Sequence, residues 1–405
     1  MNAHPSHPER TAYLDTAYLD TAGLGRMTDA VRNVLADCTV RDDRFGSYVL
    51  EEHLGEVLYS GIHRRLGELL GGVPAAGISL FTGAADAFDA FVSGLPLGPG
   101  DRIWATPHEG VAHLTTLYAL RDRTRCTLEV VPLREDGDLD LDWMRQHLDA
   151  DVALVSLVHV SSVCGTVNPV EAVGRLLAPH RARYAVDASY SAGQLPVDAT
   201  RIGCDLLTAD GWRFLRGPDG IGFAYATSAL GEPLDAPDPH PAAVAALYEA
   251  LDPAAAPAPA ATGTPYAGLP SGLHAAVART TGIDILTAGA ERSGILSFRH
   301  PDIPAGLIRR GLARRGVLVR KAVAQETPLH PAGRNLTTAV SVSVHHDNTP
   351  EDIARFGHAL QEVLREETRA RRRTAAHPLP AAAAAAGAPA LPAGARSHLS
   401  LVPRP

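Results

Sequence analysis

Short apolar runs and helix-like segments alternate along the middle of the chain. The apolar runs, several of them rich in β-branched residues, stand at 78–82, 102–105, 127–132, 152–158, 183–186, 205–208 and 221–226. The helix-like segments that separate most of them stand at 84–94, 109–121, 140–149 and 170–180. Such alternation predicts an α/β fold with a mainly parallel sheet between helices.

A second, smaller unit follows. The segments "GILSF" (294–298) and "VSVSV" (340–344) are typical of strands, and 303–316 and 349–367 are typical of helices. They predict a smaller α/β domain. We expect an N-terminal arm at 1–27, a large domain at 28–262, a linker at 263–289, a small domain at 290–368 and a disordered tail at 369–405. The stretch rich in Ala and Pro at 230–262 is expected to run over the surface.

Composition excludes several classes of protein. A chain of 405 residues with 45% hydrophobic content can bury the core of one or two domains. The net charge of −8 argues against nucleic acid or an anionic membrane as partner. No apolar run is long enough to span a bilayer, and no signal peptide is evident. The four cysteines are scattered, so we expect reduced thiols and a cytoplasmic location.

Lysine is almost absent from the chain. Lys and Arg together number 37, and only Lys321 is a lysine. Any chemistry that depends on a lysine amine must therefore use Lys321 or not occur.

Several motifs together carry a resemblance to a known family. They are "YLDTAGLG" (18–25), "HVSSVCGTVNPV" (159–170), "YAVDASYSAGQLPVD" (184–198), "CDLLTADGWRFLRGPDGIGFAYA" (204–226), "TGTP" (262–265) and "HHDNTPEDI" (345–353). In this order they resemble the class V aminotransferase group of pyridoxal-phosphate (PLP) enzymes. That group includes cysteine desulfurases, isopenicillin N epimerase-like proteins and the ergothioneine-pathway C–S lyase.

The resemblance assigns roles to residues of the 159–226 region. Asp187 matches the carboxylate that pairs with the pyridine nitrogen of PLP. Arg213 stands where the family has its Schiff-base lysine, and a guanidinium stays protonated and forms no such bond. Asp210 and Trp212 stand where the family has a Ser and a His that help to hold the phosphate. Ser162 matches the residue that contacts the cofactor's O3′.

Other assigned positions have changed or rest on weaker signals. Tyr190 replaces a Gln, and Val111 is the closest match to the aromatic residue that stacks on the ring. The phosphate cradle matches "FTGAADAF" (81–88), in which Thr82, Gly83 and Ala84 precede or begin a helix. These departures argue against covalent PLP binding.

The "TGTP" segment is well preserved. In the family, this loop reaches the cofactor phosphate of the neighbouring subunit, and Thr264 is the matching residue. The resemblance therefore implies a homodimer. The adjacent histidines of "VHHD" (344–347) are interpreted as part of a turn, so no metal is expected.

Three functional hypotheses remain open. The first is a PLP-independent enzyme on this scaffold, in specialised, sulfur or amino-acid metabolism, acting on a small anionic or amino-acid-derived substrate. Its polar pocket would contain Arg213, Asp187, Asp210, Tyr190 and His159. The second is a non-catalytic subunit that pairs with an active relative. The third is a PLP-dependent aminotransferase or C–S lyase that uses only a substrate–PLP adduct.

Overall fold

The structure, a computed structural model, describes residues 16–228, 234, 239–252, 268–330 and 338–376. The residues up to Leu364 group into one compact unit, and those from Arg365 onward form a second. The "TGTP" segment lies outside the described residues. No helix within the described ranges is both long enough and apolar enough to cross a membrane.

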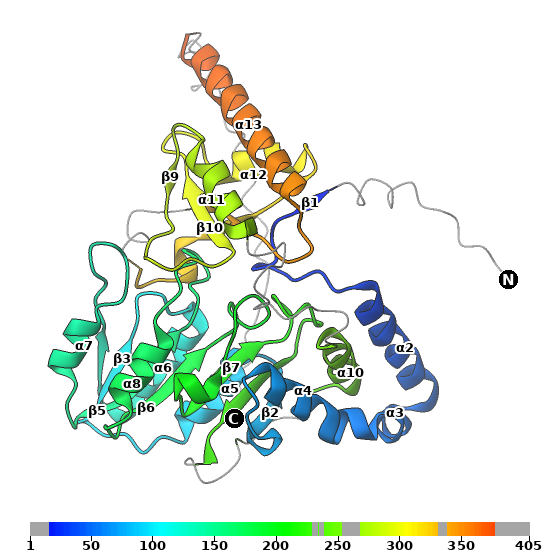
Figure 1. The fold of residues 1–405 in the computed structure, drawn as a ribbon, viewed down its shortest axis with the longest axis vertical. Helices are drawn as coiled ribbons and strands as arrows, with labels where there is room; N and C mark the ends of the chain where they lie inside the picture. The colour runs from blue at the N-terminus through cyan, green and yellow to red at the C-terminus, as the bar shows by residue number, and fades with distance from the viewer. Residues whose placement is uncertain (1–15, 229–233, 235–238, 253–267, 331–337, 377–405) are drawn as a thin grey trace, which may run out of the picture. The chain divides into compact units, whose positions relative to one another are not determined.

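The larger sheet has seven strands in the order β2-β8-β7-β6-β5-β3-β4 (Figure 1). The strands are β2 (Ile78–Phe81), β3 (Arg102–Ala105), β4 (Thr127–Val130), β5 (Val152–Val158), β6 (Arg183–Asp187), β7 (Leu206–Asp210) and β8 (Gly222–Ala226). The β2–β8 and β8–β7 pairs are antiparallel and the other neighbouring pairs are parallel, so β8 runs opposite to the rest of this sheet. The predicted fold, with its mainly parallel sheet, is confirmed.

Helices cover both faces of this sheet. They include α4 (Ile62–Leu69), α5 (Ala84–Ser93), α6 (Val111–Thr124), α7 (Leu141–His147), α8 (Val170–Leu177) and α9 (Ala199–Ile202). Successive strand residues point to opposite faces, which divides the core in two. Leu154 packs in one cluster with Phe88 of α5 and Leu117 of α6. Val155 packs in the other with Val173 of α8.

Helix α10 (Pro241–Ala250) corrects one expectation. Its residues lie in the stretch that we expected on the surface, yet Val244 and Leu247 are buried in the hydrophobic core that they share with the central strands. The small side chains of its alanines allow a close approach to α2 (Asp29–Phe45), which lies beside it (Figure 1). The Ala-rich composition therefore marks helix packing here rather than an exposed loop.

The N-terminal helices begin at a standard cap. The Thr28 hydroxyl accepts a hydrogen bond from the Val31 N–H at the start of α2. Helix α2 ends at Gly46, which has a φ of 84° and leads into α3 (Ser47–His53). A single π-helical turn, Val57–Gly61, then joins α3 to α4.

The smaller sheet has four strands in the order β12-β13-β10-β9, and every neighbouring pair is antiparallel. Its strands are β9 (Asp284–Ile285), β10 (Ile295–Arg299), β12 (Arg320–Val323) and β13 (Thr338–Ser343). Helices α11 (Leu269–Ala278), α12 (Ala305–Ala313) and α13 (Pro350–Ala376) belong to this part of the chain. Leu273, Ile308 and Phe356, one from each helix, share a core with the sheet. Helix α13 continues past residue 368, the expected end of the small domain.

The N-terminal arm joins the smaller domain to the larger one. Strand β1 (Ala17–Tyr18) pairs with β11 (Val317–Leu318) in parallel. The arm then passes the larger domain, where Gly25 N donates to the Trp212 carbonyl at 3.0 Å. This course places the arm beside the carboxyl ends of the central strands.

Candidate active site

Three of the sequence-predicted residues meet at the carboxyl edge of the central strands. His159 follows β5, Asp187 ends β6 and Asp210 ends β7. The His159 N–H donates to the Asp187 carbonyl at 2.8 Å. Carboxyl edges of parallel sheets are the usual place for ligand binding in α/β proteins.

The N-terminus of α5 forms the turn that the resemblance assigns to a phosphate. Gly83 caps this helix, and the Ala84 N–H donates to Asp210 Oδ1 at 3.0 Å. The Thr82 hydroxyl is directed to the Asp86 carboxylate. The backbone donor at the start of the helix is therefore already bonded to a carboxylate of the same chain.

Arg213 is held on several sides. Its Nε donates to Asp210 Oδ2 at 2.8 Å, and its Nη1 donates to the Ala22 carbonyl at 2.8 Å. Its Cζ lies 4.2 Å from the ring centre of Tyr190 and 3.9 Å from that of Trp212. Burial lowers the pKa of Arg213, but Tyr190 and Asp210 raise it, and the net shift is upward. The guanidinium is thus a fixed cation.

Asp187 faces a second group of buried acids and bases. Its Oδ1 accepts from the Ser189 N–H at 2.8 Å, and its Oδ2 lies 3.8 Å from His113 Nδ1. The same His113 nitrogen lies 3.9 Å from Glu109 Oε2. His113 therefore stands between two carboxyl groups at the first turn of α6.

Glu109 is completely buried. Burial first, and the charge of Asp187 second, raise its pKa to about 8. At neutral pH this carboxyl is protonated and can donate. Sequence reasoning missed Glu109 and His113, although their i, i+4 spacing in "HEGVAH" (108–113) at a predicted helix start was a usable signal.

The remaining predicted residues have different surroundings. Burial lowers the pKa of His159 to about 4, so its ring is neutral, and its Nδ1 has no hydrogen-bond partner among the described residues. The Ser162 carbonyl accepts from Arg320 Nη2 at 3.3 Å. Val111 is 51% exposed. Thr264 lies outside the described residues.

Arg320 centres a further charged group that sequence reasoning missed. Its Nη1 donates to Glu326 at 2.7 Å, and its Nε lies 3.9 Å from Asp20. Burial, the largest cause, raises the pKa of Asp20 to about 6. Burial raises the pKa of Tyr190, and the charges of Arg213 and Arg320 act in the opposite direction.

One set of potential metal ligands lies at the turn after β13. Ligand atoms of His345, His346 and Asp347 lie within 4.8 Å of one another. Asp347 is already paired with Arg216, and His345 Nε2 donates to the Phe214 carbonyl at 3.1 Å. The Arg216 guanidinium therefore already places a positive charge beside Asp347.

Comparisons with known proteins agree with this architecture. Residues 50–276 match the family model of class V aminotransferases. A probable cysteine desulfurase of Halobacterium salinarum is 34% identical over 172 residues, which are 42% of this chain and 41% of that protein. The match thus spans about two fifths of the relative's length.

Solved structures share the fold at low identity. The cysteine desulfurase CsdA of Escherichia coli, in its S-sulfonic acid form, has a TM-score of 0.78 at 19% identity and covers 89% of this chain and 96% of its own. A lysine-to-alanine variant of C-DES, with glycine covalently linked to its PLP cofactor, has a TM-score of 0.74 at 18% identity, with coverages of 88% and 100%. Because the family model matches more than half of the sequence, the chain belongs to the class V aminotransferase family.

Proposed function

We propose that this chain is a class V aminotransferase-fold protein that does not use PLP and that performs acid–base chemistry on a small substrate. The hydrogen bonds from Ala84 and Arg213 to the two oxygens of Asp210 carry the proposal. In this arrangement, a carboxylate of the chain takes the place that the resemblance gives to the cofactor phosphate. The residues present do not fit PLP.

The charges at this place argue against the cofactor. A phosphate at the start of α5 would meet the Asp210 carboxylate, and two anions repel each other at short distance. Displacing Asp210 would also leave Arg213, which is 15% exposed, without its carboxylate partner. Arg213 further packs on the rings of Tyr190 and Trp212, so the four changed residues stabilise one another.

The absence of the lysine alone would not support the proposal that the chain does not use PLP. The lysine-to-alanine variant of C-DES still holds PLP as a glycine adduct. The third hypothesis, a protein that uses only a substrate–PLP adduct, has this relative as its precedent. What distinguishes the present chain is Asp210 at the start of α5, and the proposal rests on that residue.

The remaining groups are suited to proton transfer. Glu109 is protonated at neutral pH, since its pKa is raised to about 8, and His113 lies between it and Asp187. Asp187 has no lysine or arginine within ion-pair distance among the described residues. An amine-bearing substrate therefore suits this group of residues better than an anionic one, and we infer an amino-acid-derived substrate.

The experiment is to rebuild the cofactor site. The Asp210→Ser/Trp212→His/Arg213→Lys variant frees the Ala84 N–H and supplies an amine. We expect it to retain PLP through gel filtration with the visible absorption band of lysine-bound PLP. The matched control is Arg213→Lys alone, which keeps Asp210 and should retain little PLP. Full PLP binding by the control would refute the role of Asp210.

A non-catalytic subunit is the second candidate. It is favoured by the contacts that Asp210, Arg213, Tyr190 and Trp212 make with one another. These contacts leave few polar groups available for a substrate at the position that the resemblance assigns to the lysine. A Glu109→Gln variant separates the candidates once an amine substrate has been found by screening. Loss of turnover with unchanged binding supports the enzyme, whereas the absence of turnover on any screened amine favours the subunit.

We also propose that the chain forms a homodimer. Three large side chains on the N-terminal helical segment are strongly exposed: Phe45 at 62%, Tyr48 at 80% and Tyr59 at 74%. Aromatic residues grouped on an exposed segment are typical of a subunit interface. Two-fold homodimers are the commonest soluble assembly.

A further inference from the structure

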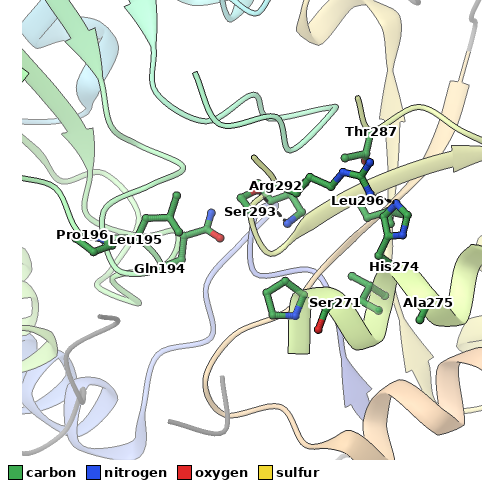
Figure 2. A pocket seen from close by; sticks show the side chains of 13 residues that line it. Gln194, Leu195, Pro196, Ser271, His274, Ala275, Thr287, Arg292, Ser293 and Leu296 are labelled. Atoms are coloured by element: carbon green, nitrogen blue, oxygen red, sulfur yellow. Dashed lines mark hydrogen bonds between the residues drawn. The ribbon is translucent and has the colours of Figure 1, made fainter. Parts of the chain in front are cut away.

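A cavity of about 540 Å³ is lined by none of the residues assigned to the candidate active site (Figure 2). One wall is the turn 194–196 of the larger domain, and the other is formed by α11 and residues 287–296 of the smaller domain. Its apolar lining includes Leu195, Pro196, Pro270, Leu273, Ile295 and Leu296. A volume of this size falls within the range of small-molecule sites.

Hydrogen bonds fix the walls of this cavity. Gly294 N donates to Gln194 Oε1 at 2.9 Å, which joins the two walls. The Ser293 hydroxyl donates to the Gly165 carbonyl at 2.9 Å and accepts from the Ile295 N–H at 3.2 Å. A site whose walls are already ordered loses little conformational entropy when a ligand enters.

Arg292 gives the cavity an unbalanced positive charge. No carboxylate lies within ion-pair distance of its guanidinium among the described residues, unlike Arg299 nearby, whose Nε lies 3.0 Å from Asp284. Its Nη1 instead donates to His274 Nε2 at 2.5 Å. Figure 2 shows the Arg292 side chain directed toward His274 on α11.

His274 is a neutral partner for this cation. An arginine can only donate, so His274 Nε2 accepts and Nδ1 carries the ring proton. Burial first, and the charge of Arg292 second, lower the pKa of His274, which keeps the ring uncharged at neutral pH. The histidine therefore orients the guanidinium without cancelling its charge.

We propose that this cavity binds a small carboxylic acid with an apolar body, the carboxylate pairing with Arg292 and the body lying on the leucine, isoleucine and proline side chains. A guanidinium matches the planar fork of a carboxylate. The predominantly apolar lining favours a ligand with one charged end over a compact polyanion. The proposal uses none of the residues of the candidate active site.

Phenylacetate and its uncharged analogue phenylacetamide are the probes. Isothermal titration of the full-length protein should show saturable binding of phenylacetate and binding of phenylacetamide weaker by about tenfold or more. Arg292→Gln should weaken phenylacetate binding by about the same factor and remove the preference between the two probes. The matched control, Arg299→Gln, changes an arginine on β10 outside the cavity and should bind as the wild type does.

A second variant tests the cavity itself. Ala275→Trp places a large ring into the space between α11 and the opposite wall, and we expect it to abolish binding of both probes while the unfolding midpoint stays close to that of the wild type. Equal affinity for both probes, unchanged phenylacetate binding in Arg292→Gln, retained binding in a folded Ala275→Trp variant, or no saturable binding to the wild type would each overturn the proposal.

Discussion

Asp210 and Arg213 form a 2.8 Å ion pair whose carboxylate also accepts the Ala84 N–H at the start of α5. Both side chains are nearly buried, at 13% and 15% exposure. A buried ion pair matters for stability chiefly because removal of one partner leaves the other as an unpaired buried charge. The pair therefore links the helix start, the end of β7 and, through the Ala22 carbonyl, the N-terminal arm.

This linkage predicts a measurable coupling between the two residues. Asp210→Asn and Arg213→Gln should each lower the free energy of unfolding by about 3 kcal/mol, because each leaves a buried charge unpaired. The double variant should lose less than the sum, with a coupling energy of about 1–3 kcal/mol. Urea unfolding of the four proteins measures it. Strict additivity would show that the pair is not an energetic unit.

The raised pKa of Glu109 predicts that the free energy of unfolding falls as the pH rises. Its pKa in the folded chain is about 8, above the ordinary value of 4.5, so the folded state holds the proton more tightly than the unfolded state. The stability that this provides is complete below pH 4.5 and is lost as the pH rises through 8. Glu109→Gln removes the ionisation.

Between pH 5 and pH 9, the free energy of unfolding of the wild type should fall relative to that of the variant by on the order of 2 kcal/mol or more. Urea unfolding at the two pH values, in the same buffer series, gives the difference. Parallel pH dependences in the two proteins would mean that Glu109 ionises normally.

Two glycines in the left-handed region predict different costs of substitution. Gly165 has a φ of 69°, and a Cβ added there would overlap the Ile295 carbonyl oxygen. Gly203 has a φ of 70°, with no atom within 4 Å of such a Cβ. Gly203→Ala should cost about 1–2 kcal/mol from the backbone alone, and Gly165→Ala about 2–4 kcal/mol. Thermal unfolding compares them; equal losses would contradict the close approach at Gly165.

The exposed aromatic residues predict the interface of the homodimer. Phe45→Ser/Tyr48→Ser should shift the protein from dimer to monomer in light scattering at micromolar concentration. Tyr118→Ser changes an aromatic residue on α6 that is only 37% exposed, and it should leave the mass unchanged. A wild type that is monomeric, or a double variant that remains dimeric, would exclude this interface.

Buried strands were the most predictable part of the fold. Residues 152–158 form a continuous apolar run except for Ser156, and all seven are buried in β5. A strand covered on both faces needs such a run, so its position can be read directly from the sequence. Helix α10 was not predicted in the core, because its burial depends on α2, a distant part of the chain.

The site was predictable only in part, for the same reason. The resemblance pointed to both Asp187 and Asp210, and Asp187 also directly follows the apolar run at 183–186. The contact between Arg213 and the Ala22 carbonyl joins residues 191 positions apart, and no local pattern signals it. Glu109 and His113 lie in the "HEGVAH" segment (108–113), but their relation to Asp187 depends on the packing of α6 against the sheet.

The most direct test of the account is the retention of PLP by the wild-type protein. The purified chain is incubated with PLP, passed through gel filtration, treated with borohydride and examined by absorption and intact mass. Because Lys321 is the only lysine, Lys321→Arg is the control for surface labelling. We predict no visible band of protein-bound PLP and no mass gain beyond that of the control. A yellow protein with one PLP per chain fixed on Lys321 would contradict the account.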